Sequence, residues 1–305
     1  MFDFMKYRFI YYIISGILVL TSIASLAMWQ LQPSIDFTGG SLVEVKYESD
    51  LGKEKERQLI EDSFREKEIE TFVIQQTGNS SWIIRVKPID EIKKNEILTL
   101  LNEKAGVKIL EQRFEVVGPT IGKEITNKTF MAIILGISCI LIYIAWTERK
   151  VSSKIASWKF GLAAIIALLH DSIITIGVFS LLGHFLNVEV DLLFVTAVLT
   201  IMSFSVHDTI VVFDRIKESF RKQSQLDLVT AVNISLTETI TRSVNNSMTI
   251  IFMLLTLLLL GGQTIFYFIL ALLIGTILGT YSSPFVATPI LLLLEGIGKS
   301  PKQKK

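Results

Sequence analysis

Cysteine is nearly absent from this sequence, and its absence excludes two kinds of structure. Cys139 is the single cysteine among 305 residues, so the chain has no internal disulfide and no cysteine-based metal site. Because Cys139 lies in an apolar run, we expect it to be a small buried hydrophobic residue. The three histidines form no His-Glu-x-x-His pattern of a zinc hydrolase.

The sequence also lacks an excess of either charge and any motif for nucleotides. Lys and Arg number 30 and Asp and Glu 29, for a net charge of +1, and no basic patch interleaved with aromatic residues indicates nucleic acid as a partner. There is no glycine-rich loop to cradle phosphates and no serine nucleophile elbow. We therefore expect no enzyme, no catalytic residues, no cofactor and no bound metal. Any work must draw on an ion gradient or a partner protein.

Long apolar runs are abundant and decide the class of protein. Half of the residues are hydrophobic and the mean hydropathy is +0.51. Runs of about 20 apolar residues are long enough to cross the hydrocarbon core of a bilayer. The sequence predicts a polytopic α-helical membrane protein with six transmembrane helices, at 9–31, 129–146, 160–182, 192–213, 239–260 and 264–294.

The first and last of these runs each admit a second interpretation. Ser25-Leu-Ala27 resembles a signal-peptidase site, but signal peptides have apolar regions of only about 7–15 residues. We therefore favour an uncleaved first helix. The last run is long for one crossing, and we expect Pro284 and Pro289 to bend or end it.

Between the first two spans, residues 32–127 have the composition of a soluble domain. The alternation of apolar and polar residues predicts strands, and apolar residues at helical spacing predict helices. Together they give the order β-α-β-β-α-β, the split βαβ unit of ferredoxin-like α+β folds. The predicted elements are 41–47, 53–67, 70–76, 81–87, 89–104 and 107–117, with a turn at 77–79 between the second and third strands.

Basic residues in the short loops predict the orientation of the chain. They follow spans two and four and end the chain, whereas the loops 183–191 and 261–263 have no Lys or Arg. By the positive-inside rule both termini are cytoplasmic and residues 32–127 are extracytoplasmic. The expected organisation is 1–31, N-terminal tail and first helix; 32–127, extracytoplasmic domain; 128–296, five-helix bundle; and 297–305, basic cytoplasmic tail. The basic residues are Arg149, Lys150, Lys154, Lys159, Arg215, Lys217, Arg221 and Lys222, with the tail 299–305.

Small residues recur at every fourth position of the sixth span, on one helical face: Ala271, Gly275, Gly279, Ser283 and Ala287. Such a stripe allows helices to approach closely in lipid. We expect a packing surface, either within this chain or against another.

Ionisable residues lie inside the predicted spans, where each costs at least a few kcal/mol unless it faces a partner or a wet cavity. Asp208 follows His207 in span four, and Arg242 lies in span five. At about 1.5 Å of rise per residue both are roughly 26–28 Å from the outer surface, so their depths match. Asp171 in span three is roughly 18 Å deep, near the midplane.

The matched depth of Asp208 and Arg242 has three interpretations. Burial opposes ionisation of a carboxyl group and a nearby arginine favours it, so the two residues can form a proton route. Alternatively they form a static ion pair that fixes helix register, or Arg242 reaches the inner headgroups. We favour the proton route. For Asp171, a structural bond to a Ser or Thr of a neighbouring helix is equally open.

The histidines are expected to make structural contacts rather than to bind a metal ion. His170 and His207 each precede a carboxylate and are predicted to be hydrogen-bonded neighbours. His184 is predicted to lie in a loop.

Five segments, in order along nearly the whole chain, resemble the SecF family of bacterial protein-export subunits. They are Asp36, Phe37, Thr38, Gly39 and Gly40 after span one; 117–122 before span two; His170-Asp171; His207 to Glu218, which includes Asp214 and Arg215; and 279–283 in span six. The combination is specific to that family. The six-span plan with one large outer domain is similar to it as well.

The resemblance implies a function that the residues alone do not. SecF-like proteins pair with SecD and belong to the resistance-nodulation-division superfamily, whose twelve-span core has two halves, of which six spans would be one. With SecYEG and SecA, such a complex uses the proton-motive force to promote late steps in the export of unfolded polypeptides across the bacterial cytoplasmic membrane. Asp208 and Arg242 match the family's proton-route residues. This chain has His207 where Asn or Asp is usual, and Lys217 where Arg is common.

Two other functions stay open from the sequence. A small-solute or drug exporter of the same superfamily would usually have a second outer domain in the same chain. A non-transporting assembly factor would use the buried charges only for structure. Sodium can replace the proton as the coupling ion, since carboxylates and hydroxyls bind both.

Overall fold

The computed structural model describes residues 3–76, 80–148, 156–223 and 225–297. Its internal contacts divide the chain into two compact units, Pro33–Met131 and Met1–Gln32 with Ala132–Lys305. The predicted turn at 77–79, three of the loop cations (149, 150 and 154) and the basic tail from 299 lie outside the described residues.

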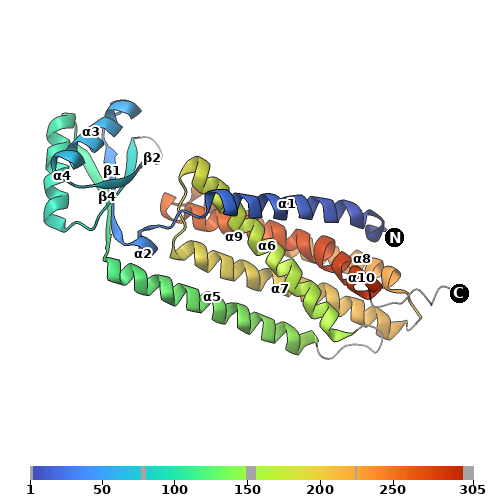
Figure 1. Ribbon diagram of the computed structural model, residues 1–305. Coiled ribbons are helices and arrows are strands. Elements are labelled where there is room, and N and C mark those ends of the chain that lie inside the picture. The colour runs from blue at the N-terminus through green and yellow to red at the C-terminus, as the bar shows by residue number, and fades with distance from the viewer. Residues whose placement is uncertain (1–2, 77–79, 149–155, 224, 298–305) are drawn as a thin grey trace. The chain divides into compact units, whose positions relative to one another are not determined.

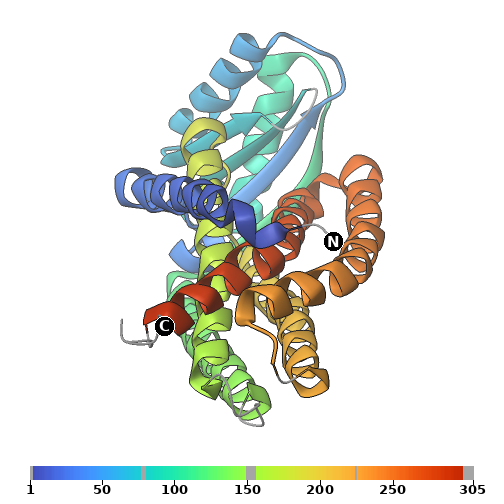
Figure 2. The same cartoon turned by 90° about the vertical axis from the view of Figure 1, so that its right-hand side faces the viewer.

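The smaller unit contains an antiparallel sheet with two helices on one of its faces (Figures 1 and 2). The strand order is β2-β3-β1-β4, and every neighbouring pair is antiparallel. This order and pairing agree with the predicted β-α-β-β-α-β sequence of elements. The elements are β1 (Gly40–Tyr47), α3 (Lys53–Glu66), β2 (Thr71–Gln76), β3 (Ser81–Val86), α4 (Glu91–Ala105) and β4 (Ile109–Val117).

Period-two alternation in the central strands builds the core of this unit. Val43, Val45 and Tyr47 of β1 pack with Ile84 and Val86 of β3 under the two helices, because alternate side chains of a strand share one face. One polar group lies among them: the Glu56 carboxylate, 1% exposed, accepts a hydrogen bond from Trp82 Nε1 at 2.7 Å. The buried carboxylate is thereby satisfied.

The glycine pair of the first motif lies at a sharp change of chain direction before β1. Ser34 caps the short helix α2 (Ile35–Thr38) through a bond to Asp36 N. Gly39 and Gly40 then have φ of 74° and 139°, a region that favours glycine. A Cβ on Gly40 would also lie 2.9 Å from the Val86 carbonyl oxygen. Both positions therefore require glycine for backbone reasons.

The larger unit is a helix bundle, and six helices among the described residues are long and apolar enough to cross a membrane. α6, α7 and α9 are its most buried members, and α1 lies alongside α6 (Figure 1). The helices are η1 (Phe4–Tyr7), α1 (Arg8–Trp29), α5 (Pro119–Glu148), α6 (Ser157–Leu186), α7 (Leu192–Lys222), α8 (Leu228–Leu260), η2 (Gln263–Ile265), α9 (Phe266–Ser282), η3 (Ser283–Ala287) and α10 (Thr288–Ile297).

The predicted small-residue stripe packs inside this chain, which resolves the choice left open by the sequence. Gly275 faces Ile201 of α7, and a Cβ on Gly279 would lie 3.4 Å from Ser205 of the same helix. The helices α7 and α9 therefore approach closely, as small residues permit. A second close approach, at Gly177 of α6 against Ser22 of α1, was not predicted.

Residues that resemble a signal-peptidase site instead hold α1 in the bundle. Ser25 Oγ donates to the Gly177 carbonyl oxygen at 3.3 Å, and Ser180 Oγ donates to the Ser25 carbonyl oxygen at 3.1 Å. These two bonds join α1 to α6.

The two prolines of span six modify the helix without ending it. Pro284 lies in a π-helical turn, η3, and α10 continues from Thr288. The hydroxyl of Thr288 donates to the Pro284 carbonyl oxygen at 2.6 Å, and that of Tyr12 to the Pro289 carbonyl oxygen at 2.6 Å. Both hydroxyls thus bind the carbonyl oxygen of a proline itself, and the bond from Tyr12 joins α1 to α10.

The predicted environments of Cys139 and His184 are wrong. Cys139 is exposed, because it lies on a face of α5 that no described residue of the chain covers. His184 is in the last turn of α6 rather than in a loop, and its ring stacks on Trp29 with centroids 4.6 Å apart. The apolar run ends at 182, but the helix continues to its αL cap at Asn187.

Candidate functional site: the buried carboxylates of the bundle

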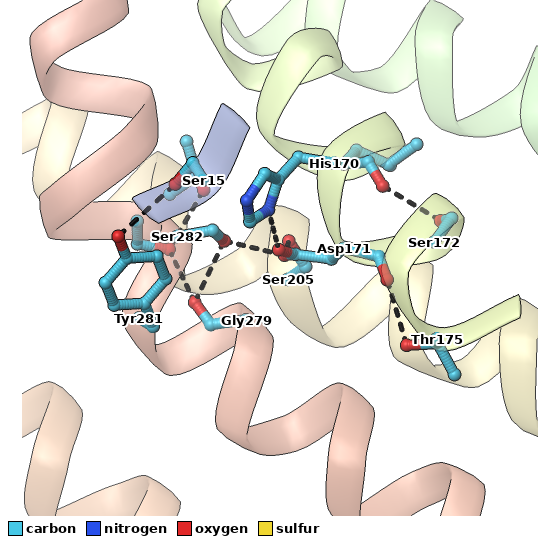
Figure 3. A network of polar contacts seen from close by, with 12 residues as sticks. Ser15, His170, Asp171, Ser172, Thr175, Ser205, Gly279, Tyr281 and Ser282 are labelled. Carbon is cyan, nitrogen blue, oxygen red and sulfur yellow. Dashed lines mark hydrogen bonds and ion pairs between the residues drawn. The ribbon is translucent and has the colours of Figure 1, made fainter. Parts of the chain in front are cut away.

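Asp171 is the most deeply buried carboxylate of the membrane helices, with 0% of its surface exposed. Its Oδ2 accepts hydrogen bonds from Ser205 Oγ of α7 and Ser282 Oγ of α9, both at 2.6 Å. Its Oδ1 lies 2.8 Å from Nδ1 of His170 (Figure 3). The predicted bond to a neighbouring hydroxyl is therefore present twice, and three helices meet at one carboxylate.

His170 is buried beside Asp171 and turns its second ring nitrogen away from it. Its ring lies 6.3 Å from that of Tyr281, whose hydroxyl is 3.3 Å from Ser15 Oγ of α1. Figure 3 shows the free side of the imidazole directed toward Ser15 and Tyr281. The predicted hydrogen bond between His170 and its neighbouring carboxylate is confirmed.

Asp208 is the second buried carboxylate, 4% exposed, on α7. Ser243 Oγ of α8 donates to its Oδ2 at 2.6 Å. His207 Nδ1 lies 3.8 Å from Asp208 Oδ1, while 71% of the His207 side chain is exposed. His207 therefore stands at the edge of the site, within ion-pair range if it is protonated but beyond hydrogen-bond range, so the hydrogen bond predicted for it is absent and Ser243 makes the short contact.

Arg242 directly precedes Ser243, the residue of α8 that bonds to Asp208. Its backbone therefore lies at about the level of Asp208, as the sequence predicts. The arginine itself is exposed, and among the described residues no ion pair joins it to Asp208. It borders a polar cavity of about 420 Å³. The cavity is lined by Val211, Asp214, Arg215, Glu218, Glu238, Thr239 and Arg242. The static pair of Asp208 with Arg242 is thus not the arrangement in this structure.

The second motif pair, Asp214 and Arg215, lies on the same side of the bundle as Arg242. Arg215 bridges Glu218 of α7 and Glu238 of α8. Asp214 accepts a bond from the buried Lys217 at 3.1 Å. These contacts tie the C-terminal part of α7 to the N-terminal part of α8 next to the polar cavity.

Sequence reasoning found the carboxylates but missed the hydroxyls that bind them. Ser205, Ser243 and Ser282 each donate at 2.6 Å. Their signal was present, since each is a polar residue in an apolar helix. Ser282 directly precedes Ser283 of the small-residue stripe, so the stripe passes beside the site. Within the described ranges no group of three or more His, Cys, Asp or Glu could hold a metal ion.

Two family models match the chain. "Protein export membrane protein SecD/SecF, C-terminal" covers residues 97–296, and "SecD/SecF GG Motif" covers residues 30–50. The first includes every helix that bears the site, and the second includes Gly39 and Gly40.

Curated relatives extend the match over almost the full length. The protein translocase subunit SecF of Thermobaculum terrenum is 40% identical over 97% of this chain and 94% of its own. The subunit of the same name from Vibrio alginolyticus is 36% identical over 97% of this chain and 90% of its own.

Solved structures agree with the sequence relatives. The crystal structure of SecDF from Thermus thermophilus, described as a translocon-associated membrane protein, matches with a TM-score of 0.83 and 30% identity over 97% of this chain. A structure of SecDF in a super-membrane-facing form matches with a TM-score of 0.68. The chain spans 39% of the length of either SecDF chain. By these matches and by its multi-pass helix bundle, the chain belongs to the SecD/SecF family of protein export membrane proteins, and within it to SecF.

Proposed function

We propose that this chain is the SecF subunit of a SecDF-type complex that uses the proton-motive force to promote late steps of protein export. The observation behind it is the buried carboxylate of Asp208, held by Ser243 of a neighbouring helix beside Arg242. Intramembrane carboxylates of this kind mark proton or ion pathways. The relatives named protein translocase subunits support the export role.

Protonation of Asp208 would change the contact between α7 and α8. The ionised carboxylate accepts the Ser243 hydroxyl proton at 2.6 Å. A protonated carboxyl group acquires a donor of its own and loses its charge, so that short charge-assisted bond weakens. Arg242, one residue away, and the polar cavity that it borders would supply the cytoplasmic access. Asp171 would be a second carboxylate on the same pathway, and His207 would adjust the charge beside Asp208.

The partner would be SecD, which supplies the other half of the membrane core. The match to 39% of a SecDF chain fits one half of such an assembly. α7 also leaves a row of polar side chains exposed, namely Thr196, Thr200, Ser203 and His207. Polar residues on a membrane helix face protein or water rather than lipid. We place SecD against this row. SecYEG, SecA and unfolded exported chains would be the further partners.

The orientation follows from the loop charges. Both termini would be cytoplasmic and the α+β unit, a ferredoxin-like domain, would be extracytoplasmic. In that position it could contact exported chains after they leave the translocon. Without a nucleotide or catalytic motif, we propose that the protein is not an enzyme and that the gradient is its energy source.

The test is export of a model precursor into vesicles carrying the complex, with and without a pH gradient. Wild type should be stimulated by the gradient, whereas Asp208→Asn and Arg242→Met should assemble normally and lose the stimulation. Thr249→Val is the matched control, because the Thr249 hydroxyl binds only the Asn245 carbonyl oxygen of its own helix. A sodium gradient in place of the pH gradient identifies the ion. Equal stimulation of all variants would refute the proposal, and loss of assembly in Asp208→Asn would favour a structural role.

A further inference from the structure

The pair of His170 and Asp171 has one polar atom that its surroundings leave without a partner. The other three polar side-chain atoms of the pair are engaged: Oδ2 by two serine hydroxyls, and Oδ1 and Nδ1 by each other. Nε2 of His170 is buried and has no hydrogen-bond partner among the described residues. Buried polar atoms are almost always hydrogen-bonded, so this exception requires an explanation.

Counting protons in the pair identifies what Nε2 can do. With one proton between Oδ1 and Nδ1, the pair has a net charge of −1 and Nε2 presents a lone pair. Protonation at Oδ2 would require at least one of the two serine O–H bonds to turn away. An incoming proton therefore forms its new bond at Nε2, which brings the pair to zero net charge. The shared proton can then lie on either Nδ1 or Oδ1 without changing that sum.

Among the described residues, the ion-pair partner of Asp171 is His170, and no Lys or Arg side chain pairs with it. From α7, Ser205 faces the carboxylate; the next ionisable residues of that helix are His207, which is exposed, and Asp208, which is bonded to Ser243 of α8. From α10, Glu295 is paired with Lys159 at 2.8 Å, eleven residues before His170. The titratable groups that face the pair from α1 and α9 are phenols: Tyr281 next to the ring, with Tyr11 and Tyr12 near Phe285 and Pro289. A buried carboxylate with no cation beside it favours a proton on its partner.

We infer that His170 and Asp171 form a second proton-binding centre, in which Nε2 of His170 receives the proton from water on the side of Ser15 and Tyr281. The inference rests on the proposed function for its use in export, but the binding of the proton does not depend on export. The hydroxyls of Ser15 and Tyr281, 3.3 Å apart, are the groups able to hold the donor water next to Nε2.

The centre is placed to act on helix packing. Ser205 belongs to α7 and Ser282 ends α9, directly before the π-helical turn. Both hydroxyls donate to the same carboxylate oxygen, so a change in the charge of the pair alters two interhelical bonds at once. π-helical turns are frequent at functional sites. Proton uptake at His170 would therefore loosen α6 from α7 and α9 at this level.

The test is ¹⁵N NMR of the full chain, labelled at histidine and reconstituted in lipid vesicles, between roughly pH 5 and pH 9. The resonance pair that disappears in His170→Gln belongs to His170. We expect Nε2 of His170 to change from unprotonated to protonated on acidification while Nδ1 remains protonated. A proton fixed on Nε2 over the whole range, or an Nε2 that never binds one, would overturn the inference.

Two variants separate this centre from the one at Asp208. Asp171→Asn should change the pH-dependent protonation pattern of the two His170 nitrogens, because it removes the carboxylate that shares the Nδ1 proton. Asp208→Asn should leave that titration unchanged, and a matching shift in both variants would refute a separate centre. Because the readout is proton binding, a failed export assay with a normal His170 titration would refute the proposed function alone.

Discussion

The close contact between α7 and α9 gives the most quantitative prediction, at Gly275. A Cβ at this position would lie 2.6 Å from Cγ2 of Ile201 and nearer still to Cγ1 and Cδ1. Carbon atoms in favourable contact are about 3.5–4.0 Å apart, and Ile201 is only 3% exposed. The side chain must therefore move by about an ångström or more into a filled core. Gly275→Ala should push the two helices apart.

The size of the effect follows from two opposing contributions. Overpacking a filled core costs about 1–3 kcal/mol, while replacing glycine by alanine in a helix gains up to about 1 kcal/mol. Gly275→Ala should therefore destabilise the bundle by about 1–2 kcal/mol. Ile201→Ala alone should cost about 2–5 kcal/mol through its cavity. The double variant should recover about 1–3 kcal/mol relative to the sum, because the added methyl group occupies part of that cavity.

The measurement is reversible unfolding of the full chain in mixed micelles, for the two single variants and the double variant. Gly16→Ala is the matched control, since nothing lies within 4 Å of a Cβ at that position on another helix. It should be neutral or slightly stabilising. If Gly275→Ala is as well tolerated as Gly16→Ala, or if the two costs simply add, the close contact of α7 and α9 is wrong.

Two further predictions concern the other unit and an ion pair between α6 and α10 of the bundle. Burial, and to a smaller extent the charge of Glu56, raises the pKa of Tyr47. The contribution of neutral Tyr47 to the stability of this unit is therefore complete below the unfolded-state pKa of about 10. It is lost as the pH rises above that value. Hydrogen exchange of the unit Pro33–Met131 should therefore show a loss of protection above about pH 10 that is smaller in Tyr47→Phe, and an equal loss in both would contradict this origin. Lys159 and the partly buried Glu295 form a pair at 2.8 Å between α6 and α10, so Lys159→Met should cost about 1–3 kcal/mol by removing a charge-assisted hydrogen bond. Combined with Glu295→Leu in the same unfolding measurement, the double variant should lose less stability than the sum of the two single variants, whereas strictly additive losses would argue against the pair.

Much of the fold was predictable because it depends on periodicity. The strands and helices of Pro33–Met131 follow alternation and helical spacing, and each predicted element is present within about two residues of its bounds. The membrane helices were found, but the lengths of the four middle ones were underestimated. α7 continues nine residues past the predicted end at 213, and α8 begins eleven residues before 239. Hydropathy detects only the apolar part of a helix, whereas the hydrogen-bond ladder continues through polar residues.

The candidate site was predictable in its charges and not in its partners. Asp171 and Asp208 are conspicuous in apolar helices, and a burial cost can be assigned to them from the sequence. Which hydroxyl meets each carboxylate depends on helix rotation and crossing, which spacing along one helix cannot give. Arg242 shows the same limit, since its depth was predicted but the exposure of its side chain was not.

The proton route through Asp208 is the central claim, and proton flux measured during export tests it most directly. Vesicles carrying the complex and an internal pH-sensitive dye would report proton movement while a precursor is exported under a pH gradient. Wild type should show a proton flux that begins with export and stops when export is complete, and Asp208→Asn should assemble but show neither flux nor stimulation. An undiminished flux in assembled Asp208→Asn would contradict the account and place the proton route elsewhere in the complex.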